Sequence, residues 1–279
     1  MVVESARSDQ PIGMFDSGVG GLTVARAVID VLPHEDVIYF GDTARCPYGP
    51  RPVEEVRRFA LEIMDALVRE QVKLLVVACN AAASAALIEA QQRYEIPVLS
   101  VIEPGVRAAT AASRNGRIGV IGTKVTISSR SYDDAVRRHN PGVTLVSQAC
   151  PRFVEFVEKG DSTSDELVAA AEAYLAPLRA SGVDTVILGC THYPLLSGVI
   201  RYVLGDDVVL ISSAEVTAEE VYVKLKDAGL LHAGELPGVH RFIASGGETL
   251  LGDLASRLLG SAFTEVEQRP WLHEPARRS

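Results

Sequence analysis

The chain has 279 residues, of which 47% are hydrophobic, and it carries a formal net charge of −9. This length suits one large domain or two of ordinary size, and we expect two. An acidic chain without a long run of Lys or Arg disfavours direct binding of nucleic acid. No segment approaches the roughly 18 uninterrupted apolar residues of a membrane span, and the first ten residues lack the apolar stretch of a secretory leader, so a cytoplasmic protein without a membrane partner is expected.

Short apolar runs rich in β-branched residues alternate along the chain with longer segments of helical period. The short runs predict strands at residues 12–15, 37–40, 74–78, 98–101, 118–121, 143–146, 185–188 and 208–211. Apolar residues spaced three and four apart predict helices at 22–31, 53–68, 165–178 and 215–226. A further strand at 241–244 and a helix at 249–259 are expected near the C-terminus. Such alternation is typical of parallel α/β sheets with helices on both faces.

An internal repeat divides the chain into two similar halves. Residues 67–80 match residues 178–191, which places Cys79 over Cys190, and residues 12–17 match 118–123. The repeat predicts two pseudo-symmetric three-layer domains with mainly parallel sheets and an active site in the cleft between them. We expect the first domain to comprise 1–102 and 213–268, the second to comprise 103–212, and the tails 1–10 and 269–279 to be loose.

The four cysteines lie far apart without a CxxC pair, so reduced thiols are expected rather than a disulfide framework or a zinc ribbon. Cys79 follows an apolar strand and precedes an alanine-rich segment that predicts a helix start, and Cys190 is expected to repeat this position. The positive end of a helix dipole lowers the pKa of a thiol, so we expect thiolate near neutral pH. Cys46 and Cys150 have no counterpart in the repeat and are expected to be structural.

Two equivalent thiols in two similar halves suit a reaction that removes a proton from one face of a carbon and returns one to the other face. Racemisation is such a reaction. No lysine accompanies a phosphate-binding glycine loop and no metal-ligand cluster stands out, so no cofactor is expected. The loop at residues 18–21, Gly-Val-Gly-Gly, matches neither the dinucleotide fingerprint nor the P-loop in full, and we expect it to bring Asp16 and Ser17 into the cleft.

Four segments of the chain resemble signature blocks of the bacterial glutamate racemases. They are residues 15–21 (Phe-Asp-Ser-Gly-Val-Gly-Gly), 41–49 (Gly-Asp-Thr-Ala-Arg-Cys-Pro-Tyr-Gly), 78–80 (Ala-Cys-Asn) and 189–194 (Gly-Cys-Thr-His-Tyr-Pro). The blocks occur in order and at family spacing, and the resemblance covers residues 12–268. It implies two α/β domains with the site between them, no metal or organic cofactor, and interconversion of L- and D-glutamate that supplies D-glutamate for peptidoglycan.

The resemblance also implies catalytic roles for individual residues. Cys79 would take the proton from D-glutamate and Cys190 from L-glutamate. Asp16 would lie beside the substrate ammonium group and the Cys79 thiol, and His192 would act on Cys190. Glu158 matches the acidic residue that the family places near His192.

The same resemblance implies a set of substrate-binding positions. Pro47, Tyr48 and Gly49 would help to hold a carboxylate. The other positions are Asp16, Ser17, Asn80, Ala81, Thr123, Thr191 and His192. Two positions depart from the family pattern: Ala81 stands where a threonine usually follows Cys-Asn, and residues 211–214 read Ile-Ser-Ser-Ala, with Ser212 in the usual Asp-Ser-Gly/Pro-Ala block. Neither departure changes the predicted activity.

Three alternatives remain open at this point. A racemase of aspartate or another small amino acid is the nearest, because one methylene changes binding by only about 1–3 kcal/mol. A cysteine hydrolase needs a single thiol nucleophile and would form a covalent adduct on one cysteine. A binding protein is the third, since some glutamate racemases are said to inhibit DNA gyrase and an acidic surface permits association with a protein that grips DNA. We expect a homodimer.

Overall fold

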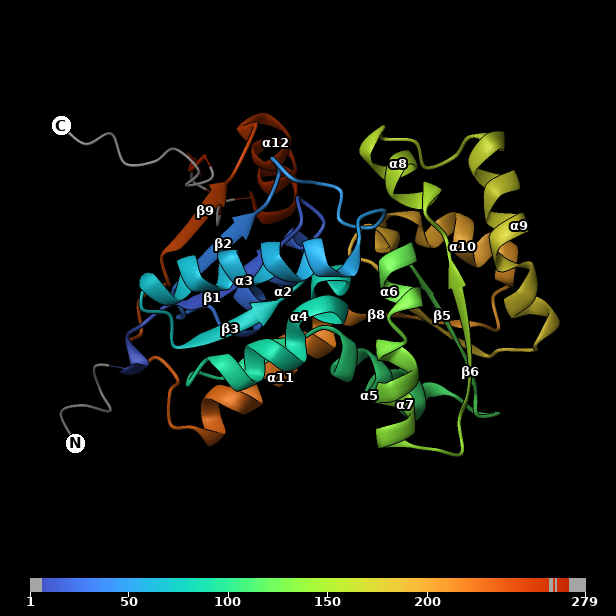
Figure 1. Ribbon diagram of the computed structural model, residues 1–279, viewed down its shortest axis with the longest axis horizontal. Coiled ribbons are helices and arrows are strands. Elements are labelled where there is room, and N and C mark those ends of the chain that lie inside the picture. Colours follow the sequence, from blue (N-terminus) through green and yellow to red (C-terminus); the bar gives the residue numbers. More distant parts are fainter. Residues whose placement is uncertain (1–6, 261–262, 264, 271–279) are drawn as a thin grey trace.

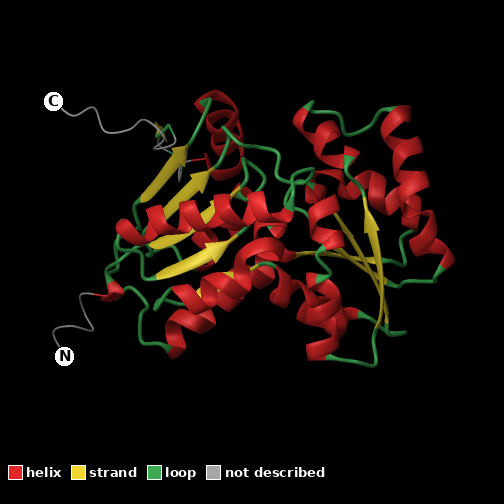
Figure 2. Cartoon of the chain, in the orientation of Figure 1, coloured by secondary structure: helices red, strands yellow, loops and turns green. Residues whose placement is uncertain are grey.

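The computed structural model describes residues 7–260, 263 and 265–270. Its strands form two sheets that lie side by side, each flanked by helices (Figure 1, Figure 2). Every strand pairing within the described residues is parallel, which confirms the predicted α/β class. The first sheet has the order β10-β9-β2-β1-β3-β4 and the second β6-β5-β7-β8.

The strands of the first sheet are β1 (Ile12–Asp16), β2 (Val37–Gly41), β3 (Leu74–Val77), β4 (Val98–Ser100), β9 (His240–Ala244) and β10 (Val266–Gln268). Those of the second are β5 (Arg117–Gly122), β6 (Thr144–Ala149), β7 (Thr185–Gly189) and β8 (Val209–Ser212). Across the first sheet four strands lie in the order β2-β1-β3-β4, and across the second they lie in the order β6-β5-β7-β8. When the strands of each half are numbered along the chain, the two orders are the same, as the internal repeat predicts. Two further strands, β9 and β10, extend the first sheet at its β2 edge.

The helices connect the strands and cover both faces of each sheet. In the first half they are α2 (Leu22–Val31), α3 (Val53–Arg69), α4 (Asn80–Arg93), α11 (Ser213–Asp227) and α12 (Glu248–Leu259). In the second they are α5 (Ile102–Ala112), α6 (Lys124–Ser128), α7 (Ser131–His139), α8 (Arg152–Glu158), α9 (Asp165–Ala180), the 3₁₀ helix η1 (Tyr193–Leu196) and α10 (Ser197–Leu204). Within the described ranges, none of these helices has the length and apolar character of a bilayer span.

The side chains of the first sheet alternate between two cores, as the pleat of a strand requires. Phe15, Ile38 and Val77 pack with α3 and α4 on one face. Met14 and Tyr39 pack with α2, α11 and α12 on the other. The second sheet is covered by α5 and α7 on one face and by α8, α9 and α10 on the other. Because both faces are buried, the carboxyl edges of the strands are where loops can form a site.

Several elements were not predicted because their sequence signal is short. Strand β10 has three residues and one apolar side chain, and α6, α8, η1 and α10 have eight residues or fewer. Of the expected loose tails, residues 1–6 and 271–279 lie outside the described residues. Arg269 is held in place, since its amide donates to the Ala244 carbonyl and its guanidinium pairs with Glu70 and Glu267.

Candidate active site

Segments that follow the carboxyl ends of five strands, β1, β2, β3, β5 and β7, meet between the two sheets and enclose a small cavity. Most of the predicted site residues line it. They are Ser17, Pro47, Tyr48, Gly49, Cys79, Asn80, Ala81, Thr123, Cys190, Thr191 and His192, joined by Cys46 and Val154. The cavity has a volume of about 20 Å³, which is room for about one water molecule. An amino acid therefore enters only when the walls of the cavity move apart.

Cys79 is the N-cap residue of α4, directly after β3 and Ala78. Its side chain is 5% exposed, and its Sγ lies 3.5 Å from Oγ of Ser17, which follows β1. The backbone amides of Ala82 and Ser17 point at the sulfur and favour its ionised form. Cys79 is therefore held between the first turn of a helix and the loop that follows the neighbouring strand.

Cys190 has a different local structure, which the repeat did not predict. It follows β7 directly, but the next helix is the four-residue η1, whose N-cap is His192. The prediction that Cys190 begins a helix as Cys79 does was wrong. Its Sγ lies 3.8 Å from Nδ1 of His192, a contact that Cys79 lacks, since the corresponding position beyond Asn80 is Ala81. The two thiols thus have different polar neighbours, Ser17 for Cys79 and His192 for Cys190.

The expectation of thiolates near neutral pH was also wrong for the closed cavity. Burial, together with the nearby Asp16 carboxylate, raises the pKa of the Cys79 thiol to about 12. Burial likewise raises the pKa of Cys190, with Cys79 and Asp16 adding to the effect. Removal of a sulfur from water outweighs the helix dipole because the dipole acts through a partial charge. Both thiols are therefore protonated in the closed state.

Asp16 lies behind the cavity wall and joins the two halves. Its carboxylate is fully buried and accepts hydrogen bonds from the Gly18 amide (2.9 Å) and from the Thr191 hydroxyl (3.2 Å). Burial raises its pKa, and the nearby His192 opposes that rise. Gly20 belongs to the same junction: a Cβ added there would lie 2.4 Å from Oγ1 of Thr191. Only glycine permits this close approach of the halves.

Glu158 also lies behind the wall, at the C-terminus of α8. Its Oε1 is 3.8 Å from Nε2 of His192 and 3.7 Å from Sγ of Cys46. Cys46 was expected to be structural and instead lines the cavity, so that prediction is corrected. Val154 was missed as well. It lies four residues before Glu158 on α8, so helical spacing would have placed both on one face.

The cavity wall also carries hydrogen-bonding groups besides the thiols. Nδ2 of Asn80 is buried without a partner, while Oδ1 of the same amide accepts from the Tyr132 hydroxyl at 2.6 Å. Tyr48 is buried and its hydroxyl donates to Asp42, so its own proton is already engaged. Gly49 lies against Thr123, and its carbonyl accepts from the amide of Val125 in the second half.

The two residues that depart from the family pattern, Ala81 and Ser212, lie in different places: Ala81 lines the cavity and Ser212 does not. Ala81 is buried in the first turn of α4 and lines the cavity, so a missing hydroxyl there faces the site. Ser212 is the N-cap of α11, where its hydroxyl accepts from the amide of Ala214. Cys150 lies in the core of the second half and not at the cavity.

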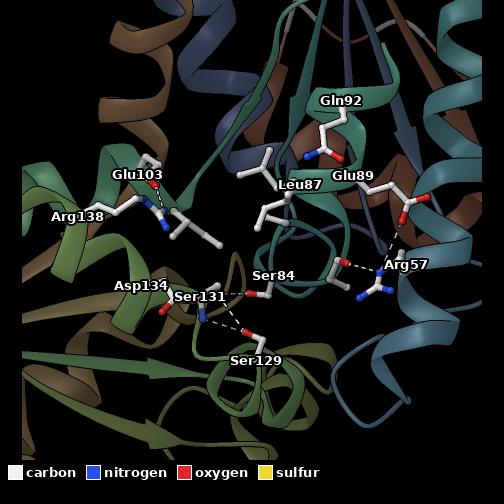
Figure 3. Close-up of a pocket in the computed structure, with 14 residues that line it drawn as sticks. Arg57, Ser84, Leu87, Glu89, Gln92, Glu103, Ser129, Ser131, Asp134 and Arg138 are labelled. Carbon is white, nitrogen blue, oxygen red and sulfur yellow. Dashed lines mark hydrogen bonds and ion pairs between the residues drawn. The ribbon is translucent and has the colours of Figure 1, made fainter.

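A larger cavity of about 450 Å³ lies farther along α4 (Figure 3). Figure 3 shows Ser84 on α4 directed towards Ser131, with the two hydroxyls 2.8 Å apart, and Arg138 paired with Glu103 at the rim. Neither thiol nor any other predicted site residue lines this space. Although this cavity is larger, we do not assign proton transfer to it, because neither thiol lines it.

Comparison with known proteins gives concordant results. The family model described as Asp/Glu/Hydantoin racemase matches residues 22–221. The glutamate racemase of Beutenbergia cavernae is 55% identical and the match covers 93% of this chain and 92% of that protein. The structure of glutamate racemase isoform RacE1 from Bacillus anthracis is 43% identical, with a TM-score of 0.88 and coverage of 94% and 97%.

A third match is the glutamate racemase of Francisella tularensis, whose structure was solved in complex with D-glutamate. It is 32% identical, with a TM-score of 0.85 over 94% of this chain and 96% of that one. All three relatives extend over both sheets and the cavity between them. The chain therefore belongs to the Asp/Glu/hydantoin racemase family and, within it, to the glutamate racemases.

Proposed function

We propose that this protein interconverts L- and D-glutamate by proton transfer between Cys79, the substrate α-carbon and Cys190, and supplies D-glutamate for peptidoglycan. The observation that carries the proposal is the convergence of two thiols from two pseudo-symmetric halves on one closed cavity. The relatives named above support glutamate as the substrate, and the Francisella protein binds D-glutamate. No cofactor is needed in this scheme.

In the proposed step, one cysteine as thiolate takes the α-proton and becomes a thiol. The carbanion-like centre then accepts a proton from the other thiol, which becomes the thiolate, so the chirality of the carbon is inverted. Cys79 takes the proton from D-glutamate and Cys190 from L-glutamate. Exchange with solvent restores the starting protonation state.

Because both thiols are protonated in the closed state, each needs a way to lose its proton when substrate is present. For Cys190 we propose His192 as the partner, since its Nδ1 is 3.8 Å from the sulfur and Glu158 lies on the far side of the ring. For Cys79 we propose Asp16, a carboxylate whose raised pKa brings it closer to that of a thiol. Asp16 and Ser17 would also lie beside the substrate ammonium group.

The remaining wall residues are proposed to hold the two substrate carboxylates. The unpartnered amide nitrogen of Asn80 is a donor that lacks a protein acceptor, and a buried donor of this kind gains most from an anionic ligand. Thr123, Thr191 and Ala81 would form the rest of this wall, with Pro47, Tyr48 and Gly49 facing the other carboxylate. Donors around the carboxylate next to the reacting carbon stabilise the charge that develops there.

The decisive experiment separates the two thiols by enantiomer. β-Chloroglutamate loses chloride after one deprotonation, so it reports each half-reaction alone. Cys79→Ser should still process the L form and Cys190→Ser the D form, while both variants lose racemisation. Cys150→Ala, which removes a buried thiol outside the cavity, is the matched control and should keep both activities. Equal losses on both enantiomers in both thiol variants contradict the two-thiol mechanism.

Substrate choice and cofactor use need separate measurements. Circular dichroism of L-glutamate and of L-aspartate, incubated with protein dialysed against chelator, compares the two substrates directly. We expect faster loss of ellipticity with glutamate and no effect of the chelator. A rate restored only by added zinc contradicts the cofactor-independent mechanism.

The remaining expectations are further proposals about the same protein. We propose that it works in the cytoplasm as a homodimer. Association with DNA gyrase is tested by the Cys79→Ser/Cys190→Ser double variant in a supercoiling assay. Inhibition that survives in this inactive variant would establish a binding function distinct from racemisation.

A further inference from the structure

The loop at residues 42–49 carries one wall of the cavity. It leaves the first sheet at the end of β2 and contributes Cys46, Pro47, Tyr48 and Gly49 to the lining. Such a loop is mobile unless its backbone and side chains are anchored by other parts of the fold. Its anchors therefore decide how accurately this wall is placed.

Asp42, the first residue of the loop, is a fully buried carboxylate with partners on both oxygens. Oδ2 accepts from Nε of Arg45 at 2.7 Å and from the Tyr48 hydroxyl. Oδ1 accepts from Oγ of Ser245 at 2.6 Å. Asp42 thus connects the cavity residue Tyr48 with a serine that lies 203 positions later in the chain.

Ser245 lies next to Asp42 because their strands are neighbours in register. Gly41 at the end of β2 pairs with Ala244 at the end of β9, so the next residues leave the sheet side by side. Ser245 is buried, and its hydroxyl donates to Asp42 while accepting from the amide of Ala44 at 3.0 Å. Its own amide donates to the carbonyl of Gly41.

Gly246, the next residue after Ser245, also contacts the loop. Its amide donates to Oγ1 of Thr43 at 2.9 Å. A Cβ added at Gly246 would lie 2.8 Å from the backbone nitrogen of Ala44, so the two segments are in direct backbone contact. The turn after β9 therefore holds three consecutive loop residues, Asp42, Thr43 and Ala44, although neither Ser245 nor Gly246 lines the cavity.

We propose that Ser245 is a positioning residue for the racemase reaction, acting through Asp42 to place the wall that holds a substrate carboxylate. This rests on the proposed function for the identity of the substrate. Without the serine hydroxyl, the carboxylate of Asp42 and the amide of Ala44 each lose the hydrogen bond that ties the loop to the turn after β9. Tyr48 then shifts with Asp42. Small displacements of a substrate-holding group are enough to weaken binding severalfold or more.

The test compares Ser245→Ala with Ser113→Ala, because Ser113 also donates to an aspartate and accepts from a backbone amide. Ser113 donates to Oδ1 of Asp184 at 2.7 Å and accepts from the amide of Gly116, and none of these three residues lines the cavity. Ser245→Ala should raise the KM for glutamate about tenfold, with a smaller fall in kcat, as expected for loss of binding to a non-reacting group. Ser113→Ala should change neither constant. Ser245→Thr, which restores the hydroxyl, should recover most of the loss in KM.

Amide hydrogen exchange gives a readout that does not depend on activity. Exchange of residues 42–49 should become about tenfold faster in Ser245→Ala and stay unchanged in Ser113→Ala. If the wild-type protein fails to racemise glutamate, the proposed function fails, whereas this exchange measurement still decides whether Ser245 anchors the loop. Unchanged exchange and unchanged KM in Ser245→Ala overturn the proposal. A Ser245→Thr variant that matches Ser245→Ala in both measurements also overturns it, because the hydroxyl would not be the cause.

Discussion

The hydroxyl of Thr191 donates a 3.2 Å hydrogen bond to Oδ2 of the buried Asp16, across a sequence separation of 175 residues. Asp16 ends β1 of the first sheet, and Thr191 lies two residues after β7 of the second. The bond therefore joins the halves beside the two thiols. Any change that separates these residues should disturb the closed cavity.

Gly20→Ala is expected to keep the halves apart. The new Cβ would lie 2.4 Å from Oγ1 of Thr191 and 2.9 Å from Nδ1 of His192, distances that side chains do not tolerate without movement. Because a displacement of about 1 Å at a catalytic group can cost about a hundredfold in rate, kcat/KM should fall by one to two orders of magnitude. Steady-state kinetics with each enantiomer measures this loss.

Gly198→Ala is the control for that substitution. Gly198 lies in α10, and a Cβ there would meet no atom within 4 Å. Activity should be unchanged, and the helix should become slightly more stable because alanine loses less backbone freedom than glycine. If Gly20→Ala retains wild-type kcat/KM, the junction does not control closure.

Stability should fall at alkaline pH. The pKa values of Cys79 and Cys190, and of the buried phenols Tyr39 and Tyr132, are raised by burial in the folded state. A raised folded pKa means that the folded protein binds these protons more tightly than the unfolded chain. Their stabilising contribution is complete below the ordinary thiol pKa of 9.0 and is lost as pH rises through the folded values.

Urea unfolding at a series of pH values between about 8 and 11 measures this dependence. The free energy of unfolding should decrease steadily above about pH 9, and Cys79→Ala should show a shallower decrease because one such group is gone. A free energy that stays constant over this range would show that the thiols and phenols are not protected from ionisation by burial.

Ala81→Thr should keep or raise kcat/KM. Ala81 lines the cavity in the first turn of α4, where the added hydroxyl would face the substrate. The opposing effect is overpacking by the larger side chain. Ala82→Thr measures overpacking alone, because Ala82 lies on the same turn but in the core and not at the cavity. Ala82→Thr should lower the melting temperature without improving kinetics. A folded but inactive Ala81→Thr protein would contradict the assigned wall.

Lys73→Met should destabilise the first half without changing the site. The ammonium group of Lys73 is buried, donates to the carbonyl of Ser8 at 2.5 Å and pairs with Glu35. Removing one partner of a buried pair costs about 3–5 kcal/mol because the other charge remains unpaired. Chemical unfolding measures this loss. The exposed pair Arg137–Asp134 provides the comparison, and Arg137→Met should have little effect.

A double variant, Lys73→Met/Glu35→Met, distinguishes charge from packing. With both charges removed, much of the stability should return, since no buried carboxylate is left without a counter-charge. If the double variant is as unstable as Lys73→Met, the loss comes from packing rather than from the unpaired Glu35.

Local patterns in the sequence determined the fold class and singled out the two thiols, whereas most of the other site residues came from the resemblance to the glutamate racemases. Strands such as β1 and β3 are short runs of apolar residues, and α3 has apolar residues at helical spacing, so nearest neighbours in the chain suffice to predict them. The repeat placed Cys79 and Cys190 at corresponding strand ends. Because the carboxyl ends of parallel strands share one edge, residues that follow different strands could be expected to meet.

Tertiary structure alone decided the electrostatics and the supports of the site. The raised thiol pKa values depend on burial between two sheets and on Asp16, and the membership of Cys46 and Val154 in the cavity depends on how the halves close. The hydrogen bond from Ser245 to Asp42 depends on β9 pairing with β2. Solvation and contacts of this kind arise between residues up to about two hundred positions apart, so no local pattern of residues contains them.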